Sequence, residues 1–279
     1  MERLTDNTLA AFEGWLAETE HSPGTIEKYI RDVRSFTRWL DIRALTKQET
    51  TQWKLQLQRS GYAPATINSM LVAVNTYLSF IGAPECRVKQ LRLQRRVFRE
   101  RTRELNREEY DRLLCTAYME GKERLALLME TICATGIRVS ELQYITVENL
   151  QRGRAEISLK GKIRTILLPA KLCRKLLKYA KKQKTAYGEI FLTRNGKPLS
   201  RKQIWAEMKA LCEKAGVERS KVFPHNLRHL FARTFYRASR DVTQLADVLG
   251  HSSIETTRIY LMSTGEEHQR QLERLGLVS

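Results

Sequence analysis

The sequence predicts a mainly α-helical protein with a small β-hairpin (an α+β fold), divided between two domains. Apolar residues recur at spacings of three and four along most of the chain, as on the buried face of an amphipathic helix. In the segment AEISLKGKIRTILLP, β-branched residues flank a glycine on both sides, which is typical of a hairpin. A helix-breaking Gly82-Ala83-Pro84 precedes an Arg-rich stretch, and 279 residues suffice for two modest domains.

Residues 1–85 are assigned to a first, helical domain. Four helices are expected there, over residues 5–20 and 25–40 and near 46–59 and 65–81. The second and the fourth begin alike, with Ser22-Pro23-Gly24-Thr25-Ile26 and Ala63-Pro64-Ala65-Thr66-Ile67. Proline is favoured near the first helical position, where its missing amide hydrogen costs nothing. These segments are either ordinary helix starts or places where a helix N-terminus meets a backbone phosphate.

Residues 86–105, which read CRVKQLRLQRRVFRERTREL, are assigned to an interdomain linker. Its many arginines suggest that it lies along the ligand. Residues 106–279 are assigned to the second domain. Its expected elements are helices near 107–120 and 122–135, a helix from Val139, the hairpin, a strand at Ile190-Phe191-Leu192 with a turn at Asn195-Gly196, and helices from Arg201 onward.

The charge of the chain is strongly positive and unevenly distributed. There are 49 Lys and Arg against 31 Asp and Glu, a net charge of +18. Residues 152–221 alone contain 20 basic and 5 acidic residues, whereas residues 1–91 are almost neutral. So concentrated an excess favours a surface that follows phosphates over a merely solubilising face. Nucleic acid is therefore the expected partner, bound mainly by the second domain.

Several other classes of protein are excluded. No run of about 18 consecutive apolar residues is present, and acidic residues stand where a signal peptide needs a basic run. We therefore expect a cytoplasmic, nucleoid-associated protein without a membrane span. The five cysteines are scattered, odd in number and never in a C-x-x-C pair, so neither a disulfide framework nor a zinc ribbon is predicted. We expect these cysteines to be buried and to pack as small apolar residues.

Three basic side chains share one face of a predicted helix in the segment FPHNLRHLF. His225, Arg228 and His229 are three and four residues apart, which aligns them on a helix. A metal site at His225 and His229 is disfavoured, because no third ligand stands at a familiar spacing and Arg228 adds a cation. Taken singly, each residue is better explained by an ordinary structural role.

Together with residues elsewhere, this face has the composition of a phosphodiester-cleaving site. Such chemistry without a metal requires fixed cations, a nucleophile and a donor that protonates the leaving oxygen. Arginines suit bidentate contact with phosphate oxygens, and Arg138 stands where a helix begins. His251 follows a helix-ending glycine, and Tyr260 comes nine residues later. Lys160 stands at the hairpin tip, a place that suits a general acid.

These residues and motifs closely resemble the tyrosine recombinases, also called phage-type integrases. The resemblance is carried, in the order and spacing of that family, by ATGIRVSEL with Arg138, the KGK hairpin with Lys160, HNLRH, LGHSS and Tyr260. It extends over residues 105–265, and more loosely over the N-terminal helices, which look like a core-binding domain. It implies a helical core-DNA-binding domain followed by a catalytic domain of the tyrosine-recombinase type.

The resemblance implies that Tyr260 attacks DNA and forms a 3′-phosphotyrosyl intermediate. That intermediate stores the bond energy for religation, so neither a metal nor a cofactor such as ATP is expected. His225 would assist the tyrosine as a base or as a donor to phosphate, and Lys160 would protonate the 5′-hydroxyl leaving group. The hairpin is one residue shorter than the Lys-Gly-x-Lys-x-Arg pattern common in the family, so Lys162 is the alternative acid.

The resemblance further implies that Arg138 and Arg228 clamp the scissile phosphate and that His251 hydrogen-bonds a non-bridging oxygen. His229 matches a position that family members often fill with histidine, and a supporting role is expected. Glu141, one turn beyond Arg138, would orient that arginine or a histidine, or is an ordinary surface residue.

An amphipathic C-terminal helix over residues 265–279, with Leu272 and Leu275 on one side, is the last expected element. In relatives such a tail docks on a neighbouring subunit; the alternative is that it packs on its own domain. The expected partners are double-stranded DNA with paired inverted-repeat core sites, three further copies of the chain in a homotetramer, and accessory DNA-bending proteins.

The resemblance favours a site-specific recombinase that acts through a four-way junction. Because core-binding sequence begins almost at Met1, no additional arm-binding domain is expected, as in Xer-type enzymes and compact mobile-element integrases. Integration and excision of a mobile element is the favoured task. Xer-type chromosome-dimer resolution, DNA inversion and, less favoured, a type IB topoisomerase are the alternatives.

Overall fold

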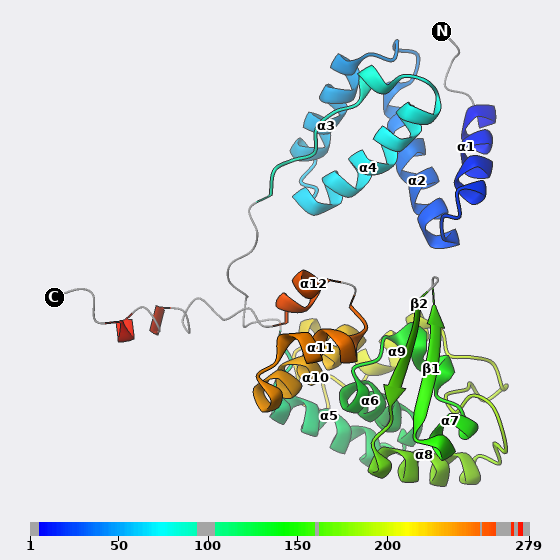
Figure 1. The fold of residues 1–279 in the computed structure, drawn as a ribbon, viewed down its shortest axis with the longest axis vertical. Coiled ribbons are helices and arrows are strands. Elements are labelled where there is room, and N and C mark those ends of the chain that lie inside the picture. Colours follow the sequence, from blue (N-terminus) through cyan, green and yellow to red (C-terminus); the bar gives the residue numbers. More distant parts are fainter. Residues whose placement is uncertain are drawn as a thin grey trace. The chain divides into compact units, whose positions relative to one another are not determined.

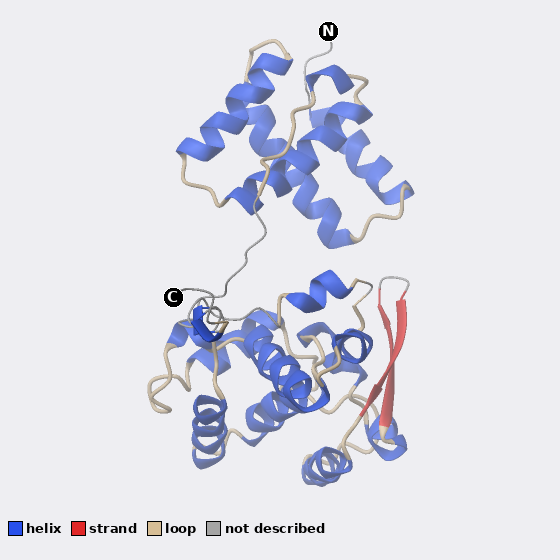
Figure 2. Ribbon diagram, turned by 60° about the vertical axis from the view of Figure 1, so that its left-hand side comes forward, coloured by secondary structure: helices blue, strands red, loops and turns tan. Residues whose placement is uncertain are grey.

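The computed structural model describes residues 6–93, 104–159, 162–251, 253–260, 269–270 and 273–275. The chain separates into two compact units, Met1–Arg95 and Arg96–Ser279. Helices make up most of both, and the described residues contain one two-stranded sheet (Figures 1 and 2). The predicted mainly helical class with a small hairpin is thereby confirmed. Within these ranges, no helix combines the length and the apolar character needed to cross a membrane.

Four helices form the first unit around one apolar core. They are α1 (Asp6–Glu18), α2 (Pro23–Leu40), α3 (Lys47–Arg59) and α4 (Pro64–Phe80), followed by a 3-10 turn at Pro84–Cys86. The large rings of Phe12, Phe36, Trp53 and Tyr77 are almost completely buried in that core. Both α2 and α4 begin with proline, as their common sequence pattern predicts, and neither has a side-chain cap.

The chain beyond residue 85 stays attached to this unit. Cys86 and Val88 are buried in its core. Two asparagines of α4 each make two hydrogen bonds to the backbone of this segment. Nδ2 of Asn75 donates to the carbonyl of Val88 at 2.8 Å, and its Oδ1 accepts from the amide of Val88 at 3.1 Å. Asn68 makes the same pair of bonds to Leu91, at 2.9 and 2.7 Å. The first residues of the segment assigned to the linker are therefore fixed along α4.

The second unit packs its helices around α6, whose residues are buried over most of their length. Its helices and strands are α5 (Arg107–Met119), α6 (Glu123–Thr135), the 3-10 helix η3 (Val139–Tyr144), α7 (Val147–Arg152), β1 (Arg154–Leu159), β2 (Lys162–Leu167), α8 (Ala170–Lys182), α9 (Arg201–Lys209), the 3-10 turn η4 (Arg219–Lys221), α10 (Pro224–Ser239), α11 (Val242–Leu249) and α12 (Ile254–Arg258). Helices α6 and α10 lie against each other, and this contact sets the frame of the site described below.

The hairpin lies along one side of the helical unit, with α7 and α8 near its base (Figure 1). Its strands are antiparallel, and the register pairs Ile157 with Arg164 and Ala155 with Ile166. Ile157 and Ile166 are buried, whereas Ile163 is 77% exposed, so alternate residues face the core. Arg164 consequently points to the same side as the buried Ile166.

Three predicted features differ in the structure. The helix expected from Val139 is the short 3-10 helix η3, which ends before α7 begins. The strand expected at 190–192 is wrong: the segment makes only isolated bridges, Thr146 to Glu189 and Leu192 to Pro198. Proline has no amide hydrogen with which to extend a ladder. Of the five cysteines, Cys115 is exposed rather than buried, because it lies on the outer face of α5.

Candidate active site

Arg228 is the most deeply buried charged residue of the site, with 1% of its surface exposed. It lies one turn into α10 and donates to the carbonyls of Gly136 and Leu249, the latter at 2.9 Å. These carbonyls belong to the C-terminal ends of α6 and α11, where helix dipoles favour a cation. Burial lowers the pKa of Arg228, while a hydrogen bond with the Tyr260 hydroxyl raises it. The guanidinium is thus fixed with its positive charge beside the tyrosine.

Gly136 allows this approach of α6 and α10. It ends α6 in the left-handed conformation, with φ of +66°. A Cβ at this position would lie 2.5 Å from Cε1 of Phe231 and 3.0 Å from Leu249. Glycine is therefore required both by the backbone turn and by the closeness of the neighbouring helices. Arg138 follows two residues later, at the start of η3.

A buried carboxylate connects two arginines next to this point. Glu141, which is 2% exposed, accepts from the backbone amide of Arg138 at 2.6 Å and from its Nη1 at 2.9 Å. It also accepts from Nη2 of Arg164 at 2.5 Å, and Nη1 of Arg164 donates to the carbonyl of Val248 at 3.0 Å. The side chain of Arg138 remains 44% exposed, so its guanidinium is held by Glu141 but is still accessible from solvent.

His251 is oriented from both ring nitrogens. Nη2 of Arg228 lies 3.0 Å from Nε2, and the hydroxyl of Thr257 lies 2.8 Å from Nδ1. An arginine only donates, so Nε2 accepts and the proton of the neutral ring is on Nδ1, which donates to Thr257. Burial, followed by the charges of the arginines nearby, lowers the pKa of His251 to about 4. The ring is neutral at pH 7.

Tyr260 follows α12 and is 5% exposed. Its amide donates to the carbonyl of Thr257 at 2.9 Å, which closes the turn that carries it. Three histidine rings surround the phenol: the ring centroids of His229, His251 and His225 lie 4.5, 5.7 and 6.2 Å from that of Tyr260. We refer to Tyr260, these three histidines and Arg228 as the tyrosine cluster.

Both histidines of α10 contact each other, with ring centroids 4.6 Å apart. His225 is in the first turn of the helix, and part of it is exposed. The surrounding protein, then the charges of Arg228 and Arg138, lower the pKa of His225. His229 lies nearer to Tyr260 than His225 does, a relation that their spacing along the helix does not reveal.

Lys160 lies outside the described residues, together with Gly161. The backbone of Lys162 is described, and it pairs with Leu159 at the end of the ladder nearest the tip. The predicted tail helix over residues 265–279 also lies outside the described part of the chain, apart from residues 269–270 and 273–275.

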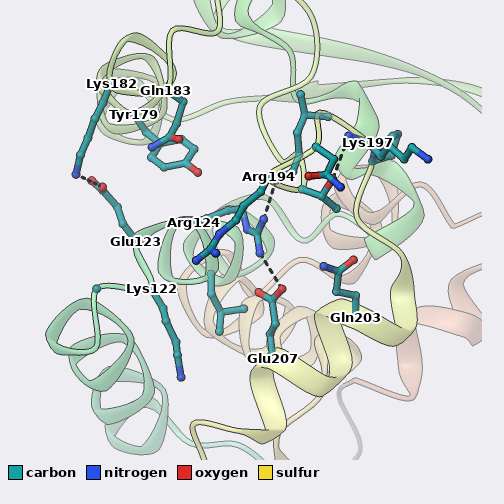
Figure 3. Close-up of a pocket in the computed structure, with 16 residues that line it drawn as sticks. Lys122, Glu123, Arg124, Tyr179, Lys182, Gln183, Arg194, Lys197, Gln203 and Glu207 are labelled. Atoms are coloured by element: carbon teal, nitrogen blue, oxygen red, sulfur yellow. Dashed lines mark hydrogen bonds and ion pairs between the residues drawn. The ribbon is translucent and has the colours of Figure 1, made fainter.

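The described residues contain no group of three or more His, Cys, Asp or Glu arranged to hold a metal ion. A cavity of about 920 Å³ lies between the N-terminal end of α6, the C-terminal end of α8 and α9 (Figure 3). Two of its cations are paired, Arg124 with Glu207 and Lys182 with Glu123, both at 2.7 Å. None of the residues of the tyrosine cluster lines this cavity.

Two known families match the sequence. The Phage integrase family matches residues 103–267, and the N-terminal SAM-like domain of phage integrases matches residues 9–83. The chain belongs to the phage integrase family. Members of this family, the tyrosine recombinases, are DNA strand-transferring enzymes of site-specific recombination, and this chain is one of them.

Named relatives extend over nearly the whole chain. The tyrosine recombinase XerA of Pyrococcus furiosus is 27% identical, over 99% of this chain and 96% of its own length. The tyrosine recombinase XerD of Staphylococcus saprophyticus is 30% identical, over 86% of this chain and 88% of its own. A solved lambda integrase tetramer bound to a Holliday junction is similar in fold, with a TM-score of 0.72, 19% identity, and coverage of 91% of this chain and 76% of that chain.

The structure thus brings together the expected site residues that it describes; Lys160 is not among the described residues. Five of them form the tyrosine cluster. Arg138 pairs with Glu141, and Arg164 connects Glu141 to the carbonyl of Val248, three residues before His251. Two side chains in these contacts were not singled out from the sequence. Thr257 has no signal of its own, but Arg164 matches the last position of the family's Lys-Gly-x-Lys-x-Arg pattern, which was a sign available in advance.

Proposed function

We propose that this tyrosine recombinase cleaves DNA through Tyr260 and forms a 3′-phosphotyrosyl intermediate. The observation that carries the proposal is the surroundings of Tyr260: a buried phenol beside a fixed arginine and three histidine rings. A fixed cation stabilises the negative charge that develops as the tyrosine oxygen attacks, and a neutral histidine accepts the proton that leaves.

In this mechanism the two arginines neutralise the phosphate while it is attacked. Arg228 is fixed by helix-end carbonyls, and Arg138 is held by Glu141 with part of its surface open to a ligand. Fixed guanidinium groups stabilise the charge that develops on the non-bridging oxygens without having to reorganise. His251 adds a third contact to these oxygens. The Thr257 hydroxyl both donates and accepts, so it can support the tautomer that carries its proton on Nε2.

The step conserves the number of phosphoester bonds. The Tyr260 oxygen bonds to phosphorus and the bond from phosphorus to the 5′ oxygen breaks. His225 takes the phenolic proton, and its lowered pKa keeps it neutral for this purpose. Lys160 gives a proton to the 5′ oxygen, with Lys162 as the alternative donor. Attack by the 5′-hydroxyl of a partner strand on the phosphotyrosine reverses these transfers and rejoins the DNA.

A DNA duplex nicked near the cleavage position tests the nucleophile, because the short fragment diffuses away and traps the covalent complex. We expect wild type to accumulate the complex and Tyr260→Phe to form none. The control is Tyr236→Phe, a tyrosine of α10 packed near the same apolar cluster, which should retain trapping. Trapping by Tyr260→Phe at the wild-type level would falsify the assignment.

The acid is identified with a 5′-phosphorothiolate substrate, whose sulfur leaving group needs no proton. Lys160→Ala should cleave ordinary DNA slowly and this substrate at nearly the wild-type rate. Lys162→Ala should show no such rescue. The reverse pattern would assign the acid to Lys162.

We further propose that the enzyme acts as a homotetramer on double-stranded DNA with paired inverted-repeat core sites. The support is the similarity in fold to lambda integrase, a tetramer of which has been solved on a Holliday junction. In this proposal residues 265–279 dock on a neighbouring subunit. Deletion of residues 266–279 should preserve DNA binding and reduce strand exchange; unchanged strand exchange would contradict the docking. A junction formed from paired sites also distinguishes a recombinase from a topoisomerase.

Two biological tasks fit this chemistry. Integration and excision of a mobile element is the task that we propose, whereas the names of the relatives XerA and XerD weakly favour resolution of chromosome dimers. Locating the bound sites in the genome by sequencing of covalently trapped DNA decides between them. One site near the replication terminus indicates dimer resolution, whereas sites at the two ends of an inserted segment indicate integration.

A further inference from the structure

Arg164 occupies a position of the hairpin where an apolar side chain is expected. It points to the inner side of β2, as the buried Ile166 does, and is paired with the buried Ile157. Its side chain is only 15% exposed. A buried cation is unfavourable unless it is paired, and burial indeed lowers the pKa of Arg164. The contacts of this guanidinium must therefore account for its presence.

Those contacts join two parts of the site that are far apart in sequence. Nη2 donates to Glu141 at 2.5 Å, and Glu141 in turn binds both the amide and the guanidinium of Arg138. Nη1 donates at 3.0 Å to the carbonyl of Val248, in the last turn of α11, three residues before His251. One side chain thus touches the carboxylate that orients Arg138 and the helix end that carries His251.

Two further observations indicate that this placement is specific. The Nε of Arg164 is buried without a hydrogen-bond partner, so the side chain is placed for its two Nη contacts and not for complete satisfaction of its donors. Gly250 lies directly against it: a Cβ there would overlap Cδ of Arg164 and lie 2.8 and 2.9 Å from its Nη1 and Nε. The backbone at Gly250, directly before His251, therefore packs too closely against the Arg164 side chain to leave room for a Cβ.

We propose that Arg164 is a positioning residue of the cleavage site, which sets Arg138, through Glu141, at a fixed distance from His251. The inference rests on the proposed function, in which these two residues bind the same phosphate. A displacement of about 1 Å of a group that binds the reacting phosphate costs on the order of 100-fold in rate. Lysine is not equivalent, because one ammonium group does not reproduce the planar fork that reaches both acceptors.

The test compares Arg164→Met and Arg164→Lys with Arg154→Met, which removes an exposed arginine from the first strand of the same hairpin. Single-turnover cleavage is measured on an ordinary phosphodiester and on a methylphosphonate, in which a methyl group replaces one charged oxygen. Because the methylphosphonate is uncharged, its cleavage depends less on charge neutralisation by Arg138. Both Arg164 variants should lose about 100-fold on the diester and less than about tenfold on the methylphosphonate, while Arg154→Met loses little on either.

The ¹⁵N chemical shifts of the His251 ring provide a readout that needs no cleavage. Without DNA, wild type should show a single tautomer with its proton on Nδ1, and Arg164→Met a mixture of tautomers. Equal losses on the two substrates, together with an unchanged His251 spectrum, would overturn the proposal and leave Arg164 a structural residue. Absence of a covalent complex in wild type would instead refute the proposed function, and the spectrum would still decide the placement of His251.

Discussion

Substitution of Gly250 by alanine tests the closeness of the backbone to Arg164. Gly250 ends α11 in the left-handed conformation, with φ of +63°, and the new Cβ would overlap Arg164. Gly153 provides the matched control, since it ends α7 with φ of +69° and a Cβ added there would have no atom within 4 Å. Any difference between the two substitutions therefore comes from the contact and not from the backbone conformation.

The magnitudes follow from these two costs. A left-handed alanine costs about 1 kcal/mol, which is all that Gly153→Ala should lose. In Gly250→Ala, Arg164 must also move, although both of its ends are tied to Glu141 and Val248. Overpacking of this kind adds about 2 kcal/mol, for a total of about 3 kcal/mol. In a unit of this size, 1 kcal/mol corresponds to about 3 °C, so the expected losses in Tm are about 3 and about 9 °C.

Thermal unfolding of the two variants provides the measurement, with single-turnover cleavage measured in parallel. We expect Gly250→Ala to slow cleavage, because His251 is the next residue, and Gly153→Ala to leave cleavage unchanged. Combination with Arg164→Ala should remove most of the additional instability of Gly250→Ala, since the overlapping atoms are gone. Equal Tm losses for Gly250→Ala and Gly153→Ala would show that the contact between Gly250 and Arg164 adds no cost.

Three more predictions concern the same site. Thr257→Val, which removes the partner of His251, should slow single-turnover cleavage about five- to tenfold, and Thr257→Ser should restore it; equal rates for the two variants would contradict this role. Glu141→Gln should lower the unfolding free energy by about 3 kcal/mol in urea titrations, because it leaves two arginines without their carboxylate, whereas the exposed Glu156→Gln should change it little. The pKa of His251 is lowered to about 4 in the folded protein, so between pH 7 and pH 5 protons bind mainly to the unfolded chain and stability falls as the pH falls. The unfolding free energy of wild type should therefore decrease by up to about 2 kcal/mol more than that of His251→Asn over this range, and an identical pH dependence in both would contradict it.

Local patterns were sufficient to predict most of the helices. In the first unit each helix lies within two residues of its predicted range, because apolar spacing and helix-starting prolines are local signals. The strand predicted at 190–192 is wrong because a strand also needs a partner strand, which local composition does not reveal. The composition of this segment suits a strand, but the residues that it contacts are distant in the sequence. Its backbone binds Ile145 and Arg124, neither of which offers a ladder.

The chemistry of the site was easier to predict than its support. Reactive side chains occur in recognisable motifs, whereas the residues that hold them act through contacts that sequence does not display. The family pattern marks the position of Arg164, but it does not reveal that this side chain reaches the carbonyl of Val248, 84 positions further along the chain. The nearness of His229 to Tyr260 depends likewise on how α12 returns toward α10.

In the proposed reaction Tyr260 becomes covalently joined to a 3′-phosphate of cleaved DNA. Protein trapped on a nicked substrate is digested, and the peptide that carries the nucleotide is identified by mass spectrometry. We expect a nucleotide joined through its 3′-phosphate to the peptide that contains Tyr260, together with a free 5′-hydroxyl on the released strand. An adduct on any other residue, or one joined through a 5′-phosphate, would contradict it.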